Sequence, residues 1–348
     1  MDKIDFIVTW VDDTDLNWRL KRKEYEEFEF VQTKRFFPKQ INKEDANDNC
    51  RFRDIGTLRY WFRAVEINAP WVNQVFFVTC GQIPAWLNTD HPKLHLVNHT
   101  DFIPERFLPT FNSNTIEMNL HRIEGLSERF VLFNDDMFLL QSVNPSFFFK
   151  DKEPVLMSSL RYPLYPHLNA INRIKFNNYV LINNHFNTKK SIWRNRSKWF
   201  SLKELGFNRV RRNFLCYLAN GTIPVGQYGH LPLPHLRSSF SDIWSCCPDV
   251  MEETSKYRFR SDFQVNQWVL CAWNQANGHF YPADEKKLGC HIDISPESIG
   301  WIEDVIKKQM YPQICVNDTR YNLDYNDCAD RIIAAFETIL PDKSSFEI

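Results

Sequence analysis

Apolar runs alternate with amphipathic stretches through the first 140 residues of the chain. Runs rich in β-branched and aromatic residues are typical of buried strands, and they occupy residues 4–11, 75–79, 94–98 and 130–133. Apolar positions at helical spacing predict helices over residues 16–30, 57–68 and 113–123, the last with the capping-type pattern Asn114-x-x-Glu117. The alternation predicts an α/β fold with a mostly parallel sheet and helices on both of its faces.

The pattern changes after residue 150. Prolines become frequent, a basic segment covers residues 189–212, residues 226–234 are loop-like, and helical spacing returns near residues 263–274 and 329–339. We therefore expect three parts along the chain. They are the α/β part over residues 1–150, a basic and aromatic, mainly helical insertion over 151–225, and the remainder of the α/β domain with C-terminal helices over 226–348.

The composition excludes several classes of protein. Aromatic residues make up 15% of the 348-residue chain and charged residues 24%, which excludes a disordered chain. Only 10 glycines occur, and neither common glycine-rich phosphate motif is present, so charged side chains or a metal must hold any phosphate. The net charge of −1 argues against bulk binding of nucleic acid.

Cysteine usage and hydropathy indicate the compartment. The 9 cysteines are scattered with no C-x-x-C pair, which fits a reducing compartment where thiols act as small apolar residues. The N-terminus lacks the basic and then apolar pattern of a secretory signal, and no apolar run reaches the roughly 18 residues of a membrane span. The sequence predicts a soluble cytoplasmic protein.

Polar side chains follow the first and fourth predicted strands, at the sheet edge where ligands collect in parallel sheets. Asp12 and Asp13 follow the first strand, and Asn134, Asp135 and Asp136 follow the fourth. Two carboxylates at the end of a buried strand can hold a Mg²⁺ or Mn²⁺ that bridges a diphosphate. The alternative is that these acids cap the next turn or helix, which is common.

Two arginine-bearing segments suit phosphate binding. Arg53 and Asp54 precede a predicted helix, while Arg258 and Arg260 alternate with aromatic residues before Asp262. Guanidinium groups on one face of an extended segment can clamp a phosphate. A solvated charge cluster is the alternative for both segments.

The histidines leave several interpretations open. Glu117 and His121 share a face of their predicted helix, next to Arg122, and this pair suits metal ligation, acid/base chemistry or a plain side-chain contact. His230 and His235 stand beside prolines in a predicted loop. A loop histidine can present a general base, although structural histidines are more frequent.

Other chemistries leave weaker signals. A short apolar run over residues 314–316 ends in Asn317 and Asp318, an echo of the strand end near residue 134 that a turn explains equally well. No G-x-S-x-G nucleophile elbow occurs, and no cysteine stands in a recognisable nucleophile context.

Taken in order, these segments resemble the four blocks of the Stealth family of sugar-phosphate transferases. The blocks correspond to residues 3–12, 51–138, 230–262 and 314–318, of which the second is the longest and most specific. The resemblance implies a GT-A or Rossmann-like fold of the nucleotide-sugar transferase type. It further implies a bacterial enzyme of capsule synthesis, related to N-acetylglucosamine-1-phosphotransferase.

The same resemblance implies an activity and its partners. A hexose or N-acetylhexosamine 1-phosphate would pass from a UDP-sugar to a hydroxyl of a growing capsular polysaccharide, with release of UMP. Residues 1–150 would bind the nucleotide-sugar and residues 151–225 would lie on the side of an anionic, phosphodiester-linked acceptor. No nucleic acid is expected as a partner. A peripheral place at the inner face of the bacterial inner membrane, beside a capsule-assembly complex, is compatible with this function.

The implied roles fall into three sets. The ligands of Mg²⁺ or Mn²⁺ would be Asp135, Asp136, Asn317 and Asp318. The catalytic residues would be His230, Asp136, Arg258, Arg260 and His121, with His230 as the base and His121 or His235 as alternatives. The donor-binding residues would be Asp12, Arg53, Asp54, Asn114, Glu117, Arg122, Asn134, His235 and Asp262.

Two other functions stay open at this point. A metal-dependent glycosyltransferase would use the same donor and acids but release UDP. A non-catalytic polysaccharide-binding protein would use aromatic side chains as sugar platforms. The basic segment 189–212, which includes Trp193, Trp199 and Phe200, is interpreted as a grip on the anionic polymer, with a solvated helix face or a weak membrane contact as alternatives.

Overall fold

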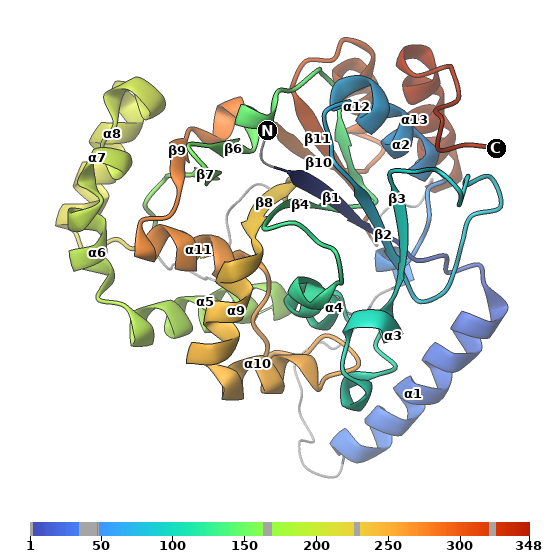
Figure 1. Ribbon diagram of the computed structural model, residues 1–348, viewed down its shortest axis with the longest axis horizontal. Coiled ribbons are helices and arrows are strands. Elements are labelled where there is room, and N and C mark those ends of the chain that lie inside the picture. The colour runs from blue at the N-terminus through green and yellow to red at the C-terminus, as the bar shows by residue number, and fades with distance from the viewer. Residues whose placement is uncertain (1–2, 35–46, 48, 163–168, 226–229, 320–324) are drawn as a thin grey trace.

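The computed structural model describes residues 3–34, 47, 49–162, 169–225, 230–319 and 325–348. A five-stranded sheet forms its centre, in the order β3-β2-β1-β4-β8 (Figure 1). The strands are β1 (Ile4–Thr9), β2 (Val75–Thr79), β3 (Leu94–Asn98), β4 (Arg129–Asn134) and β8 (Leu233–Leu236). The first four are mutually parallel and β8 is antiparallel to β4. The predicted strands and the mostly parallel sheet are thus confirmed.

The direction in which the strand order runs reverses between β1 and β4. From β1 the sheet grows through β2 and β3 on one side and through β4 on the other. In parallel α/β sheets a crevice opens outside the carboxyl ends of the strands at such a reversal. The two strands end side by side there, because Thr9 pairs with Asn134 in the ladder.

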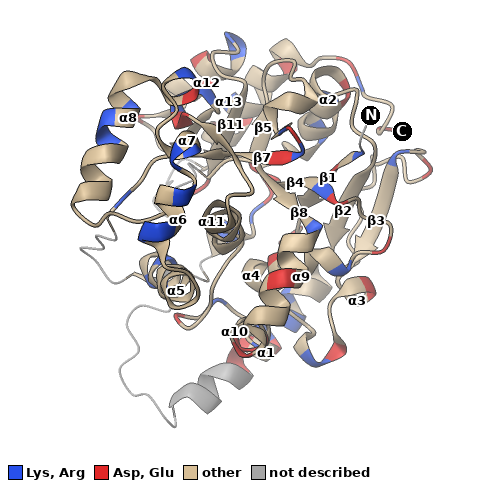
Figure 2. Cartoon of the chain, turned by 60° about the vertical axis from the view of Figure 1, so that its left-hand side comes forward, with Lys and Arg blue, Asp and Glu red and all other residues tan. Residues whose placement is uncertain are grey.

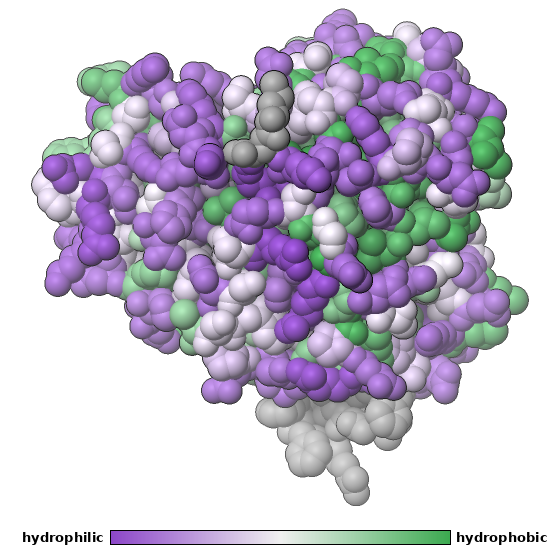
Figure 3. All heavy atoms as spheres, in the orientation of Figure 1, coloured by the Kyte–Doolittle hydropathy of each residue, from purple (hydrophilic) through white to green (hydrophobic). Residues whose placement is uncertain are grey.

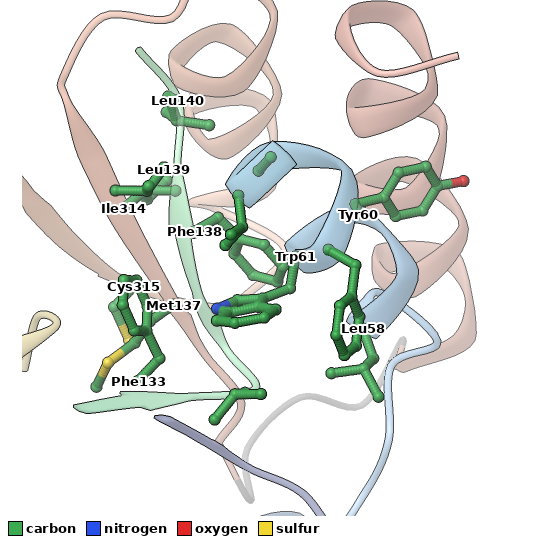
Figure 4. Packing of buried hydrophobic residues seen from close by; sticks show 14 of the residues in the cluster. Leu58, Tyr60, Trp61, Phe133, Met137, Phe138, Leu139, Leu140, Ile314 and Cys315 are labelled. Atoms are coloured by element: carbon green, nitrogen blue, oxygen red, sulfur yellow. The ribbon is translucent and has the colours of Figure 1, made fainter. Parts of the chain in front are cut away.

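Successive side chains of the central strands feed two hydrophobic cores, one on each face of the sheet. Phe6 and Phe133 belong to one core, together with Trp61, and Ile7 and Leu132 belong to the other. Figure 4 shows Trp61 packed edge-on against Phe133 in the first core, with a ring separation of 5.4 Å. Strands buried on both faces explain the nearly continuous apolar runs of the sequence.

Helices cover both faces of the sheet. The first half of the chain supplies α1 (Leu16–Lys34), α2 (Leu58–Asn68), α3 (His99–Phe102) and α4 (Ser113–Asn119). The last third supplies α9 (Arg237–Cys246), α10 (Pro248–Ser255), α11 (Trp268–Asn277), α12 (Ile299–Lys307) and α13 (Tyr325–Ile339). None of the described helices combines the length and apolar character that crossing a bilayer requires.

Residues 170–218 form the mainly helical region that the sequence predicted. It contains α5 (Ala170–His185), α6 (Thr188–Arg194), α7 (Arg196–Trp199) and α8 (Leu202–Leu218), which lie at the left of Figure 1. The part boundaries at residues 150 and 225 stay predictions, since strands from the last third also join the first part.

Two small sheets complete the fold. One has the order β10-β11-β5 and comprises β5 (Met137–Leu139), β10 (Cys290–Asp293) and β11 (Gln313–Asn317). The other comprises β6 (Phe149–Lys150), β7 (Glu153–Met157) and β9 (Tyr281–Ala283). Because β5 follows β4 after only Asp135 and Asp136, these two acids form the turn that joins the central sheet to the second sheet. The Val316 amide donates to the Asp136 carbonyl at 2.8 Å and fixes this turn.

Three local predictions differ from the structure. Residues 233–236 form an edge strand where a loop was expected, and Pro234 is tolerated there because an edge strand need not donate on its outer side. Residues 226–229 of that loop lie outside the described part of the chain. Helix α11 begins at Trp268, not at residue 263. The cap of α4 is Asn112, whose side chain accepts from the Asn114 amide, so the pattern beginning at Asn114 was misplaced.

Candidate active site

A cavity of about 1140 Å³ opens at the carboxyl ends of β1 and β4. Residues from the first 140 positions, from α5 and from the last third of the chain line it together. The sequence-predicted residues in its lining are Arg53, Asp54, Asn114, Glu117, Asn134, Asp135, Asp136, His230, Arg260, Asn317 and Asp318. Asp12 is not part of the lining, but it lies close enough to Asp54 to raise the pKa of that carboxyl.

Asp135 is the most perturbed acid of the cavity. Burial, then the charge of Asp136, then that of Asp54 raise its pKa well above the usual range of an aspartate. The pKa of Asp54 is also raised, first by its own burial. Carboxylates gathered this closely repel one another, and a cation between them would relieve that repulsion.

Asp136 is the point where three potential metal ligands meet. Its Oδ2 lies 3.7 Å from His230 Nε2 and accepts from the Cys315 thiol at 3.4 Å. Its Oδ1 is buried and has no hydrogen-bond partner among the described residues. Asp136, His230 and Cys315 are the one group of His, Cys, Asp or Glu in the described ranges whose ligand atoms lie within 4.8 Å of one another. Asp136, His230 and Cys315 therefore fit a divalent cation, and Asp135 lies next to them in the same turn.

A second polar layer, which the sequence did not reveal, stands behind His230. The rings of His230 and His291 are 5.6 Å apart, and His291 Nε2 lies 3.4 Å from Asp293 Oδ1. Asn317 donates to that same Asp293 oxygen at 2.6 Å, because β10 and β11 pair these two residues. Burial and then the charge of His230 lower the pKa of His291. The alternation of Cys290, His291, Ile292 and Asp293 was the available signal, since an edge strand of polar alternate residues presents one polar face.

Arg53 and Asp318 form a tight ion pair at another part of the cavity wall. Arg53 Nη2 lies 2.6 Å from Asp318 Oδ2, and the guanidinium stands 4.2 Å from the centre of the Tyr325 ring. Asp318 was predicted as a metal ligand, but its carboxylate is directed at an arginine. Arg53 is thereby held in place, and its Nη2 also donates to the Thr319 carbonyl at 3.3 Å.

Arg260 and Glu117 are electrostatic partners at the end of α4. Arg260 donates from Nη2 to the Ser113 hydroxyl at 2.7 Å. Burial, then Arg51, lower the pKa of Arg260 to about 10, while burial of Glu117 raises the pKa of that carboxyl to about 7 despite the opposing charge of Arg260. Because Glu117 is only weakly acidic here, it competes little with a bound anion for the guanidinium of Arg260.

Glu117 is expected to make the stability of the fold depend on pH. Its pKa in the folded state is about 7, against an ordinary value of 4.5, so the folded state keeps its proton longer than the unfolded chain does. The free energy of unfolding of the wild type should therefore fall as the pH rises from 4.5 to 7. This fall should be about 3 kcal/mol larger than the fall in Glu117→Gln over the same pH range. Urea unfolding of both proteins at several pH values measures this difference. Parallel pH dependences would contradict it.

Besides Asp12, five predicted site residues lie outside the cavity lining, and each has another partner. His235 is fully buried in β8 and bonds to Gln267 at 2.9 Å. His121 is buried and stacks on Phe240. Arg122 lies over the ring of Trp244, Arg258 donates to the Leu108 carbonyl, and Asp262 pairs with Arg173. The structure places these five side chains in contacts outside the cavity lining, and their roles at the donor or the reacting groups stay predictions.

The basic segment 189–212 also lies away from the cavity. It forms α6, α7 and part of α8, and none of its residues lines the cavity. Other cationic side chains do line the cavity, among them Arg161, Lys175 and Lys286. A polymer bound along residues 189–212 would therefore not reach the cavity through that segment, because none of its residues lines the cavity.

Comparison with known proteins gives consistent relatives. Residues 51–156 match the family model described as Stealth protein CR2, conserved region 2. The capsular polysaccharide phosphotransferase WcwK of Streptococcus pneumoniae is 36% identical over 347 residues, covering 100% of this chain and 99% of that protein. The receptor polysaccharide phosphotransferase WefC of Streptococcus gordonii is 36% identical over 351 residues and the whole of both chains.

Among solved structures, the galactosyltransferase LgtC in complex with donor and acceptor sugar analogs covers 98% of each chain. The identity is 10% and the TM-score 0.38, a likeness too weak to locate any site residue.

The sheet is Rossmann-like, and an acidic cavity lies where its strand order reverses. Two phosphotransferases are similar to this chain over its whole length. Together these findings identify a transferase. The chain belongs to the Stealth protein family. The family resemblance noted in the sequence is thereby confirmed.

Proposed function

We propose that the enzyme transfers a hexose or N-acetylhexosamine 1-phosphate from a UDP-sugar to a hydroxyl of a growing capsular polysaccharide. The observation that carries this proposal is the pairing of Asp135 and Asp136 with His230 in one cavity, in a chain 36% identical to a capsular polysaccharide phosphotransferase over its whole length. UDP-sugars are made in the cytoplasm, so the reaction belongs on that side of the membrane.

The proposed reaction breaks and forms bonds at phosphorus only. The acceptor oxygen attacks the phosphorus next to the sugar, and the bond from that phosphorus to the oxygen bridging to UMP breaks. UMP leaves with the electron pair of that bond, and a phosphodiester remains between the sugar and the acceptor. The anomeric carbon keeps its oxygen, so its configuration is retained.

His230 takes the proton of the acceptor hydroxyl in this scheme. Asp136 lies 3.7 Å from His230 Nε2 and stabilises the imidazolium that forms. His291 and Asp293 lie behind it and restrict where the ring can turn. A histidine is suited to the task because its ordinary pKa is close to neutral pH.

Mg²⁺ or Mn²⁺ would be held by Asp135 and Asp136, whose carboxylate oxygens are the ligands that such ions prefer. When bound, the ion neutralises phosphate charge in the donor. The Cys315 thiol beside Asp136 would add a soft sulfur ligand, which suits Zn²⁺ better than Mg²⁺ or Mn²⁺. Asn317 donates its amide to Asp293 and supports this layer from behind.

Phosphate charge would be met by two arginines that are already positioned. Arg260, fixed by Ser113, and Arg53, fixed by Asp318, are both in the cavity lining. Fixed donors stabilise charge in a transition state better than mobile ones, because they do not reorganise as the charge develops. Asp54, with Asp12 behind it, and Asn114 would shape the nucleotide end. The acceptor would approach past Arg161 and Lys175.

The products decide between this function and its rivals. We expect incubation with a panel of UDP-sugars, Mn²⁺ or Mg²⁺ and short phosphodiester-linked oligosaccharides to release UMP, and phosphorus NMR to detect a new phosphodiester. Release of UDP would identify a glycosyltransferase. Acceptor binding with no turnover of any donor would instead identify a polysaccharide-binding protein.

A further inference from the structure

Helix α8 carries its apolar side chains outward. After Gly206, where the backbone is not helical, the exposed residues include Phe207, Phe214, Leu215 and Leu218, with exposed fractions of 70%, 46%, 57% and 58%. In an ordinary surface helix such residues face the core and charged residues face the solvent. The pattern of α8 is the reverse.

Beyond Gly206, the buried side of α8 carries Cys216 and two firmly bonded polar residues, and these bonds fix the orientation of the helix. Arg209 is 4% exposed, donates to the Ser159 hydroxyl at 2.7 Å and pairs with Asp284 at 3.0 Å. The Asn213 amide donates to the carbonyls of Ser158 and Trp199, both at 2.8 Å. Turning the apolar side inward would leave these buried groups without partners, at a cost that forbids the rotation.

The exposed apolar residues form one continuous stripe. Phe207, Phe214 and Leu218 are separated by seven and four positions, so they lie on one face of the helix, and Leu215 lies next to them. Trp193 of α6, itself 51% exposed, stacks on Tyr217 at 5.9 Å and continues the stripe across to the next helix. We call these six residues the outward face. Figure 3 shows green hydrophobic atoms over α8, at the upper left, among hydrophilic ones.

The outward face is surrounded by positive charge. The exposed cationic residues of this region are Lys189, Lys190, Arg194, Arg196, Lys203, Arg211 and Arg212. Between residues 189 and 218 there is one acid, Glu204, and its carboxylate accepts from Tyr281 at 2.5 Å. Figure 2 shows the blue segments on α6, α7 and α8.

We propose that the outward face binds peripherally to the interface of an anionic lipid bilayer. Phe207, Phe214, Leu215 and Leu218 enter the boundary of the acyl chains, and the surrounding cations contact headgroup phosphates. Apolar residues flanked by lysine and arginine are the combination that such interfaces bind. The proposal does not depend on the reaction catalysed, because no residue of α8 lines the cavity.

Two other occupants fit less well. A sugar polymer uses aromatic faces and cations, but it has no apolar surface to bury against Leu215 and Leu218. A second copy of the chain bound through the same face would bring two sets of cations together across the two-fold axis. Lipid satisfies the apolar and the cationic residues at once.

Sedimentation with vesicles tests the proposal on the full-length chain. We expect the protein to pellet with vesicles of phosphatidylglycerol and phosphatidylcholine and not with vesicles of phosphatidylcholine alone. Arg211→Gln with Arg212→Gln should lower the partition coefficient about fivefold per charge. Leu215→Asn with Leu218→Asn should lower it about tenfold per residue. Circular dichroism and the thermal midpoint check that each variant is folded.

Matched variants elsewhere provide the controls. Ile67→Asn with Ile83→Asn removes two aliphatic side chains that are similarly exposed, and Lys307→Gln with Lys308→Gln removes two exposed charges. Both should bind like the wild type. Equal losses in these controls, or a wild type that stays in the supernatant, would overturn the proposal. Two further results would also overturn it. One is that soluble polyglycerol phosphate displaces the protein from vesicles and that Leu215→Asn with Leu218→Asn leaves this displacement unchanged. The other is a dimer that dissociates in the same double variant.

Discussion

Asp135→Asn is expected to abolish transfer and, at the same time, to stabilise the fold at neutral pH. Activity should fall by about a thousandfold or more, because the proposed cation at the donor diphosphate would lose a ligand. The folded-state pKa of Asp135 is raised by burial and by Asp136, so the ionised carboxyl opposes folding and this opposition grows as the pH rises. Turnover assays and thermal unfolding of the two proteins between pH 5 and pH 8 measure both effects.

Addition of Mn²⁺ separates the ligand role of Asp135 from a general effect of charge. The ion should raise the thermal midpoint of the wild type, because it binds only the folded state, and should leave that of Asp135→Asn nearly unchanged. Asp304→Asn is the control, since Asp304 lies on α12 and pairs with Lys308 at 2.9 Å. It should keep normal turnover. An Asp135→Asn enzyme with near-normal turnover would remove this residue from the mechanism.

His230→Asn is expected to reduce transfer by about a hundredfold to ten-thousandfold with folding intact. Asparagine is the suitable replacement because His230 has a φ of +46°, a left-handed conformation that asparagine adopts more readily than most residues. The loss should appear mainly in kcat, since in the proposed mechanism the histidine takes a proton and does not hold the donor. Steady-state kinetics with the donor and acceptor varied separately measure it.

Cys315→Ala tests whether His230 acts as a base or as a metal ligand. If His230 acts as the base, the alanine variant keeps its metal affinity and most of its turnover, whereas His230→Asn loses turnover alone. If Asp136, His230 and Cys315 together hold the metal, both variants lose metal affinity in parallel. That outcome, measured by calorimetric titration with Mn²⁺ or Zn²⁺, would contradict the role of His230 as the base.

The acidic part of the site was predictable because it follows directly from a strand. The apolar run before Asn134 had to be a buried strand, and the residues after such a strand emerge at the ligand-binding edge of the sheet. No detail of side-chain packing was needed.

The predicted residues that lie outside the cavity do so because of local geometry that a sequence does not specify. Glu117 and His121 would share a face of an ideal helix, but α4 ends at Asn119 and tightens into a 3₁₀ turn over residues 120–122. His121 is thereby turned into the core beside Phe240 while Glu117 stays in the cavity. Likewise the segment before Asp262 bends, so Arg258 and Arg260 diverge. His291 and Asp293 were missed because an alternating strand does not say which element its polar face will meet, and the pairing of β10 with β11 brings it to Asn317.

The turn at Asp135 and Asp136 affects how much conformational entropy the enzyme loses when it binds its ligands. Its backbone is held from both ends, by the ladder of β4 with β1 and by that of β5 with β11, and the Asp136 carbonyl accepts from Val316. The two acids are therefore in place before any ligand arrives, and binding does not have to freeze a flexible loop. Conformational entropy that would otherwise oppose association was already lost when the protein folded.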